Sequence, residues 1–251
     1  MTDSSLRSDF VPEAVWEDRP VRVLIGDDHS LFRRGLLVAF EDEGDIEVLG
    51  EGDQGPELVA LAEQLAPDVI LIDSSVPPYG GVAAVAQINR TVPTARVVLL
   101  TADENDTEEL LEGIGAGAVG VIVKEHALDD APAVVRQVAA GRSVLTPAVA
   151  GAIRDFVKSE PAPAAGLPGL GVTDRERVLI DVLARGADAA AAGRGLDIDE
   201  TTAQNLQLNV VRRLQRFWRA DDIVVSLSRR QSDTALADVA EAARRVVDTS
   251  T

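Results

Sequence analysis

Short apolar runs alternate with segments of helical period along the first half of the chain. The apolar runs have the length and β-branched character of buried strands, and they cover residues 21–26, 46–49, 69–72, 97–100 and 119–123. Apolar residues at helical spacing mark five further segments, at residues 31–40, 56–65, 82–88, 108–114 and 133–139. Because continuously apolar strands must be covered on both faces, this alternation predicts parallel strands joined by crossover helices, an α/β fold with a (βα)5 doubly wound parallel sheet.

The second half of the chain has a different pattern. Residues 159–171 (SEPAPAAGLPGLG) are rich in Pro, Ala and Gly without periodicity, which predicts a linker. Beyond it the spacing predicts only helices, at residues 173–185, 188–196, 199–219, 221–228 and 233–247. We therefore expect five parts, namely an N-terminal extension (1–20), an α/β domain (21–140), a linker helix with the Pro/Ala/Gly linker (141–171), an all-α domain (172–231) and a C-terminal helix (232–251).

Composition narrows the classes of function. Of 251 residues 46% are hydrophobic, which is enough to build cores. No apolar run approaches the roughly 18 residues that span a bilayer, and the first twenty residues lack the pattern of a secretory signal. We therefore expect a cytoplasmic protein without membrane contact. The absence of cysteine excludes disulfides and thiolate sites, and two histidines leave little for a histidine-ligated metal centre.

Charge is distributed unevenly along this acidic chain, whose net charge is −18. Residues 1–161 hold 12 basic and 29 acidic residues, whereas residues 162–251 hold 12 and 13. Nucleic acid repels an acidic protein unless one face is locally basic. Any contact with nucleic acid is therefore expected in the second half.

Polar side chains follow four of the predicted strands. Asp27 and Asp28 follow the first strand, Asp73 ends the third, Thr101 ends the fourth and Lys124 ends the fifth. The carboxyl ends of parallel strands meet at one edge, so these side chains can converge on one pocket. Three adjacent carboxylates need a counter-charge, and Mg²⁺ with oxygen ligands supplies it. Such a site can hold a phosphoryl group, with Asp73 as the nucleophile that forms an aspartyl phosphate.

Each of these residues alone says little, because an isolated Asp after a strand is usually a turn former or a helix cap. Together they resemble the receiver domain of response regulators in two-component signalling. The matching stretches are IGDDHSLFRRGL (25–36), DVILIDSSVPPYGG (68–81), VVLLTAD (97–103) and GAVGVIVKE (117–125).

The resemblance implies a role for each pocket residue. Asp73 is the phospho-acceptor, and Asp28, Asp73 and the Ser75 carbonyl bind Mg²⁺, with Asp27 held through water. Thr101 is the switching hydroxyl, and Lys124 pairs with the phosphate. The phosphoryl donor is a histidine kinase or a small phosphodonor. No enzyme activity beyond slow self-dephosphorylation is expected, because Ser75 stands where a phosphatase of similar pocket has its acidic general acid/base.

Two departures from this family concern how the pocket signals. Val76 stands where a Met is frequent, and Val121 stands where an aromatic switch residue is frequent. In the family the aromatic ring swings inward when the threonine moves toward the phosphate. A valine side chain has one torsion angle and no ring, so it cannot respond to that movement in the same way.

The longest predicted helix of the second half is basic. Residues 204–219 contain four arginines and no acidic residue. Amide side chains near its start and arginines near its end are suited to a major groove, where amides read base edges and guanidinium groups hold phosphates. The alternative is a solvated face whose arginines pair with nearby acidic residues, and the periodicity alone favours neither.

Residues 172–231 resemble a LuxR-type helix-turn-helix, as in response regulators of the NarL/FixJ type. The matching stretches are VTDRERVLIDVLARG (172–186), in which Thr173 and Glu176 form a capping box, and GLDIDETTAQNLQLNVVRRLQRF (195–217). The resemblance implies a scaffold helix at 188–196 and a recognition helix at 200–217. The candidate DNA-contacting residues are Thr202, Gln204, Asn205, Gln207, Asn209, Arg212, Arg213 and Arg216.

The helix-turn-helix also departs from its family. Ala192 and Gly193 replace a core Ile and an Ala in the scaffold helix, which removes buried volume. Gln204 and Leu206 replace a common Lys and a common His in the recognition helix, which removes roughly one phosphate contact.

The sequence thus predicts a response regulator in which Mg²⁺-dependent phosphorylation of Asp73 controls dimerisation and DNA binding, and so transcription. Its expected partners are a kinase or small phosphodonor, promoter DNA and a second copy of the chain. The alternative is an atypical or phosphorylation-independent regulator with a degenerate helix-turn-helix that acts through protein–protein contacts.

Overall fold

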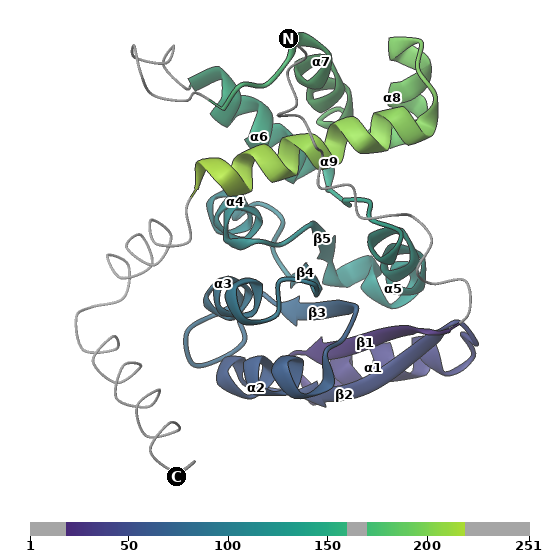
Figure 1. The fold of residues 1–251 in the computed structure, drawn as a ribbon, viewed down its shortest axis with the longest axis vertical. Coiled ribbons are helices and arrows are strands. Elements are labelled where there is room, and N and C mark those ends of the chain that lie inside the picture. Colours follow the sequence, from purple (N-terminus) through teal and green to yellow (C-terminus); the bar gives the residue numbers. More distant parts are fainter. Residues whose placement is uncertain (1–18, 160–169, 219–251) are drawn as a thin grey trace, which may run out of the picture.

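The computed structural model describes residues 19–159 and 170–218. Its first part is a parallel sheet with helices on both sides (Figure 1). The strands are β1 (Val21–Gly26), β2 (Ile46–Gly52), β3 (Val69–Asp73), β4 (Arg96–Thr101) and β5 (Gly120–Val123). Their order across the sheet is β2-β1-β3-β4-β5. The strand order reverses between β1 and β3, and parallel α/β sheets form their binding crevice at such a point.

The helices of this part cover the two faces of the sheet. They are α1 (Ser30–Glu41), α2 (Gly55–Leu65), α3 (Gly81–Thr91), α4 (Thr107–Ala116) and α5 (Lys124–Ala139). Successive side chains of a strand point to opposite faces. In β3, Ile70 and Ile72 therefore join the core under α2, α3 and α4, while Leu71 joins the core under α1 and α5. The predicted α/β fold with helices on both sides of the sheet is confirmed.

Helix α5 is longer than the sequence pattern indicates. The pattern predicts a helix over residues 133–139, whereas α5 begins at Lys124 and contains Pro132 in its interior. A proline has no N–H to donate within a helix, which makes the upstream segment a poor helix candidate by sequence. Burial of Ala127 and Ala131 against the sheet stabilises that segment in the fold. The early start places Lys124 directly at the end of β5.

The second part is helical, as predicted. It comprises α6 (Pro147–Ser159), α7 (Asp174–Leu183), α8 (Ala189–Leu196) and α9 (Glu200–Phe217). Thr173 caps α7 and forms the predicted capping box with Glu176. Asp188 caps α8 and Asp199 caps α9, each by accepting a backbone N–H with its carboxylate.

Helix α9 lies between the other C-terminal helices and the α/β part (Figure 1). Its residues Val210, Val211 and Leu214 belong to the same buried cluster as Leu110 and Ile114 of α4. The two parts therefore share a core in this structure.

Several predicted features lie outside the described residues. They are the helix at 221–228, the C-terminal helix at 232–251, most of the extension at 1–20 and most of the linker at 159–171. Within the described ranges, no helix has both the length and the apolar character needed to cross a bilayer.

Candidate functional site

The predicted polar residues meet at the carboxyl edge of the sheet. Asp27 directly follows β1, Asp73 is the last residue of β3, and both are buried. Lys124, at the start of α5, inserts its ammonium between them, with Nζ 2.7 Å from Asp27 Oδ2 and 3.0 Å from Asp73 Oδ1. One cation thus compensates two carboxylates that would otherwise repel each other at the strand ends.

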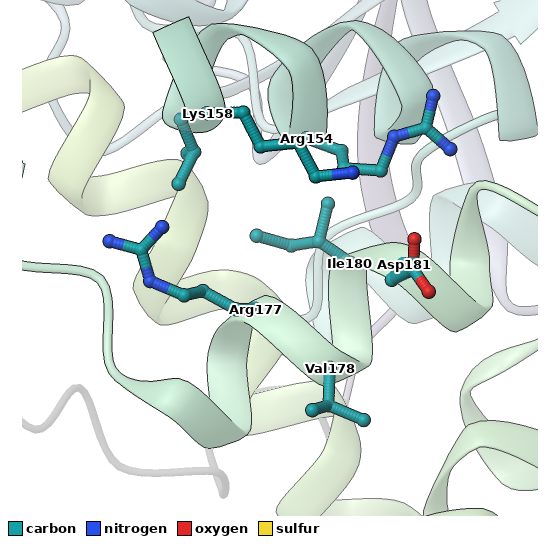
Figure 2. A pocket seen from close by; sticks show the side chains of 7 residues that line it. Arg154, Lys158, Arg177, Val178, Ile180 and Asp181 are labelled. Carbon is teal, nitrogen blue, oxygen red and sulfur yellow. The ribbon is translucent and has the colours of Figure 1, made fainter. Parts of the chain in front are cut away.

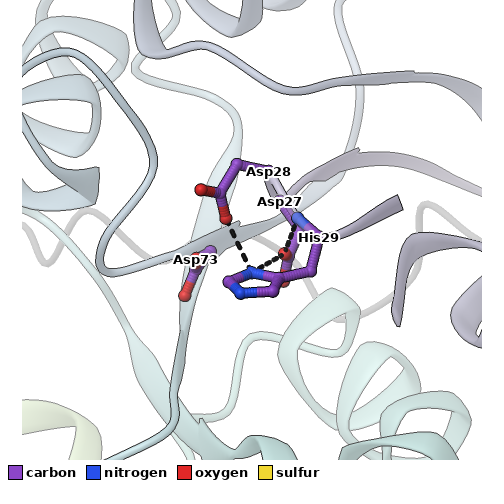
Figure 3. Close-up of side chains that lie close together, drawn as sticks. All are labelled: Asp27, Asp28, His29 and Asp73. Atoms are coloured by element: carbon purple, nitrogen blue, oxygen red, sulfur yellow. Dashed lines mark hydrogen bonds and ion pairs between the residues drawn. The ribbon is translucent and has the colours of Figure 1, made fainter. Parts of the chain in front are cut away.

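The carboxylates form a cluster suited to a cation (Figure 3). One ligand atom from each of Asp27, Asp28, His29 and Asp73 lies within 4.8 Å of the others. The three carboxylates provide the oxygen donors that Mg²⁺ prefers, so the residues present fit the expected ion. The side chain of Asp28 is 40% exposed, which leaves one side of the cluster open to solvent.

His29 was not predicted as a member of this cluster. Its Nδ1 lies 2.7 Å from Asp28 Oδ1 and 3.2 Å from Asp27 Oδ1. Its backbone N–H donates to Asp27 Oδ1 over 2.8 Å. The sequence signal that could have identified His29 was its position directly after Asp27 and Asp28. An imidazole is a softer donor than a hard cation such as Mg²⁺ prefers, so we assign His29 to orienting the carboxylates.

The two hydroxyl groups of the predicted site are oriented differently. The Ser75 hydroxyl donates to Asp73 Oδ2 over 2.8 Å. Thr101 ends β4 beside Asp73, since Leu100 pairs with Asp73 in the sheet. Its hydroxyl nevertheless donates to the Asp103 carbonyl over 2.9 Å, within its own loop. In this conformation Thr101 is next to the acceptor without bonding to it.

The loop after Asp73 returns closely to the strand end. Gly81, the first residue of α3, donates its N–H to the Ser74 carbonyl over 2.6 Å. A Cβ at this position would lie 2.2 Å from the Asp73 carbonyl oxygen. Gly80 before it has a φ of +82°, in the left-handed region that favours glycine. The paired glycines therefore fix the backbone of the acceptor.

Glu109 on α4 is a charged group near the pocket that the sequence did not single out. Burial, followed by the nearby charge of Asp106, raises the pKa of its carboxyl above the ordinary value, and a hydrogen bond with the Ser74 side chain opposes this shift. The charge of Asp73 contributes in the same direction as burial. Glu109 is therefore sensitive to negative charge at the acceptor.

Four of the predicted DNA-contacting residues lie on one exposed face of α9. Asn205, Asn209, Arg212 and Arg216 are all exposed. Their spacing of four, three and four residues places them along one side of the helix. This face joins amide groups near the helix start to guanidinium groups near its end.

The other four predicted residues are arranged differently. Gln207 is buried, and its side chain donates to the Ser143 carbonyl over 2.9 Å. The prediction that Gln207 is part of the DNA-contacting face is wrong for this conformation, because the residue packs toward the α/β part. Arg213 points to α7, with Nε 3.3 Å from the buried Glu176. Gln204 donates to Glu200 within α9, and Thr202 lies in the first turn.

Further contacts hold α9 on the α/β part. The Gln215 side chain donates to the Ala118 carbonyl over 3.0 Å. Trp218 packs on Gly115 of α4, where a Cβ would lie 2.7 Å from the indole ring. Together with Gln207 these contacts fasten both halves of the basic helix.

Helix α8, the predicted scaffold helix with the small residues Ala192 and Gly193, is closely packed. Ala192 is fully buried, and at Gly193 a Cβ would lie 2.9 Å from the Ile198 carbonyl oxygen. The small residues let α8 approach the turn before α9, so the loss of side-chain volume is matched by a closer backbone contact.

Comparisons with known proteins bear on both parts of the chain. The family model for the response regulator receiver domain matches residues 23–136. The response regulator protein VraR of Staphylococcus aureus is 30% identical over 204 residues, which are 81% of this chain and 95% of VraR.

Solved structures extend the likeness. A two-component response regulator of the LuxR family from Aurantimonas sp. is 25% identical, with a TM-score of 0.51 over 55% of this chain and 97% of that one. The RcsB response regulator of Salmonella typhimurium is 20% identical, with a TM-score of 0.50 over 78% of this chain and 92% of that one. At 20% identity, the similarity to RcsB shows a shared fold alone.

Proposed function

Because this chain belongs to the response-regulator family of two-component signalling and has LuxR-type relatives, we propose that phosphorylation of Asp73 controls DNA binding by α9 and thereby transcription. The phosphoryl donor is a histidine kinase or a small phosphodonor, and Mg²⁺ is the cofactor. The protein works in the cytoplasm as a homodimer on promoter DNA. It accepts and slowly loses a phosphoryl group, and it is not otherwise an enzyme.

The observation that carries this proposal is the placement of Lys124 between Asp27 and Asp73. The transfer forms a bond from an Asp73 carboxylate oxygen to phosphorus, while the bond from phosphorus to the donor atom breaks and the leaving group keeps the electron pair. Lys124 is placed to pair with a phosphoryl oxygen on the product. The Thr101 hydroxyl reaches another oxygen only after turning away from Asp103.

The cation site follows from the same residues. Asp28 and Asp73, with the Ser75 carbonyl, would hold Mg²⁺, and Asp27 would bind it through water. When bound, the ion neutralises charge on the phosphoryl oxygens.

The arrangement of α9 supports control of DNA binding. A helix that enters a major groove is surrounded over much of its circumference, because the groove is about 12 Å wide and 8.5 Å deep. Gln207 and Gln215 bind α9 to the α/β part along one side. We propose that phosphorylation loosens these contacts and frees the face that carries Asn205, Arg212 and Arg216.

An apolar surface on α1 and α5 supports the homodimer. Leu31 is 86% exposed, Val38 is 53% exposed and Leu128 is 42% exposed. Leu128 packs on α1 at Gly35, so the three side chains belong to one surface. Exposed apolar surfaces of this kind mark sites of association.

A second candidate is a phosphorylation-independent regulator that acts through protein contacts. Val121 favours it, because this residue is 1% exposed on β5 and has no ring that could move between two positions. Under this candidate, the Asp73→Asn variant retains wild-type DNA affinity and wild-type output.

The proposal is tested by incubating the full chain with a small acyl phosphate, with and without Mg²⁺, and measuring phosphoryl incorporation by intact mass. The wild type is expected to gain one phosphoryl group only with Mg²⁺, and Asp73→Asn none. DNA selection on both forms then compares their affinities. Equal incorporation by Asp73→Asn would overturn the assignment of the acceptor.

A further inference from the structure

A groove on the C-terminal part of the molecule lies between α6 and α7 (Figure 2). Lys158 extends from α6 at this groove, and Arg177 extends from α7. The apolar residues Val157 and Ile180 of its lining are already buried by the helices themselves. Little apolar area is therefore left there for an occupant to cover. The surroundings of Lys124, at the carboxylate pocket, say more about function.

The Lys124 ammonium faces an aromatic ring as well as two carboxylates. Its Nζ lies over the ring of Phe32, 4.9 Å from the ring centroid. A cation within about 6 Å of a ring centroid is attracted by the negative face of the π system. The Lys124 side chain is only 13% exposed, and the exclusion of water strengthens this attraction. Asp27, Asp73 and Phe32 are thus three partners of one ammonium.

Phe32 lies at the boundary between the core and the pocket. It belongs to the first turn of α1, and with Leu36 and Phe40 it forms a stripe at intervals of four residues. Leu36 and Phe40 are buried in the core under α1 and α5, and the partly buried Phe32 packs against the same core. Core packing alone accounts for such a stripe. It does not account for an ammonium over the ring at the pocket end.

The turn that carries Phe32 is fixed to Asp27 on both sides of the ring. Before Phe32, the His29 N–H donates to Asp27 Oδ1 over 2.8 Å. After it, the Arg33 guanidinium donates to the Asp27 carbonyl. The ring is therefore held at a set place relative to the pocket carboxylates, as a group that positions another must be.

We propose that Phe32 is a positioning residue that acts on phosphoryl transfer through Lys124. The ring holds the ammonium while it exchanges a carboxylate oxygen for an oxygen of the incoming phosphoryl group. Because the ring attracts the charge without fixing the direction of any N–H, the ammonium stays in place while its donors turn. This role rests on the proposed function, since it concerns the same transfer to Asp73.

The test varies the electron density of the ring and leaves its shape nearly unchanged. Phenylalanine with one, two or three fluorine atoms on the ring is introduced at position 32 of the full chain. Each fluorine withdraws electron density from the ring face and weakens its attraction for a cation. The rate of Mg²⁺-dependent phosphorylation by a small acyl phosphate is expected to fall stepwise, by about three- to tenfold over the series.

Phe40 provides the matched control, because it is a second ring of α1 and is buried in the core. The same fluorinated residues at position 40 should leave the rate unchanged. Phe32→Leu should slow the transfer as much as the most fluorinated ring does. Phe32→Tyr keeps the π face and should stay within about twofold of the wild-type rate. Circular dichroism confirms that each variant is folded.

A second measurement does not require phosphorylation. In urea denaturation, the fluorinated series at position 32 should lower the urea concentration at the unfolding midpoint stepwise. In the Lys124→Met variant the same series should leave the midpoint unchanged, because no cation then faces the ring. A wild type that takes up no phosphoryl group would contradict the proposed function, and these midpoints would still decide whether the ring holds the ammonium.

Three results would overturn the role of Phe32. They are a phosphorylation rate that does not change with fluorination at position 32, an equal decline with fluorination at position 40, and a series of unfolding midpoints at position 32 that is the same with Lys124 and with Lys124→Met.

Discussion

The Lys124 ammonium lies 3.0 Å from Asp73 and 2.7 Å from Asp27, so one cation holds two buried carboxylates together. Lys124→Met removes this charge and keeps much of the side-chain length. Because two carboxylates are then left without a counter-charge, the free energy of unfolding is expected to fall by about 3 kcal/mol. Urea denaturation measures this loss.

Magnesium provides the control for Lys124→Met. A cation that binds the native cluster stabilises it by mass action. Mg²⁺ should therefore raise the urea concentration at the unfolding midpoint more for Lys124→Met than for the wild type. Equal shifts in the two proteins would contradict the view that Lys124 and the ion neutralise the same carboxylates.

Gly81→Ala tests the close approach behind the acceptor. The new Cβ would lie 2.2 Å from the Asp73 carbonyl oxygen, so the backbone must move. We expect a loss of about 1–3 kcal/mol in the free energy of unfolding and slower phosphorylation of Asp73. Gly44→Ala is the matched control, because nothing lies within 4 Å of its Cβ position. Similar stability in both variants would be evidence against the constraint.

Gln207→Leu distinguishes a DNA-reading residue from one that fastens α9. If Gln207 holds α9 through the Ser143 carbonyl, its loss should raise the DNA affinity of the unphosphorylated protein severalfold. Arg212→Ala, on the exposed face, should lower DNA affinity. It should also reduce the slope of the logarithm of affinity against the logarithm of salt concentration by about one. Fluorescence anisotropy over a salt series measures both. A lower affinity for Gln207→Leu would restore the role first predicted from the sequence.

Glu109→Gln tests the charge on α4 through pH. The pKa of Glu109 in the folded protein is raised by burial, so ionising this carboxyl destabilises the fold. That penalty is absent below the ordinary pKa of about 4.5 and present at pH 7. Glu109→Gln should therefore be more stable than the wild type at pH 7 and equal to it near pH 4. Glu108→Gln, at the neighbouring exposed position, serves as the comparison for thermal denaturation at both pH values.

The carboxylate pocket could be predicted because it depends on strand ends. Apolar runs locate the strands, and parallel connections bring all their carboxyl ends to one edge. Asp27, Asp73 and Lys124 follow from that rule. The same rule does not predict the positions of His29 and Glu109. His29 lies at the start of α1 and Glu109 lies on α4, and the approach of each helix to the pocket depends on packing.

The contacts of the basic helix α9, in contrast to the pocket, could not be predicted from the sequence. Its composition and period identified α9 and its arginines, yet half of the candidate contacts do not lie on the exposed face. Gln207 and Arg213 are polar residues in a helix, and sequence gives no reason to place them against Ser143 and Glu176. Which side of a helix is covered depends on elements far away in the chain.

The sequence by itself determined the α/β order, the basic helix and the meeting of aspartates with Lys124, since local period and chain direction are properties of neighbouring residues. Only the tertiary structure decided that Gly115 receives Trp218, that Gln215 bonds to Ala118, and that α9 shares a core with α4. Those contacts join surfaces whose complementarity arises after each part has folded, because shape and burial are properties of packed elements.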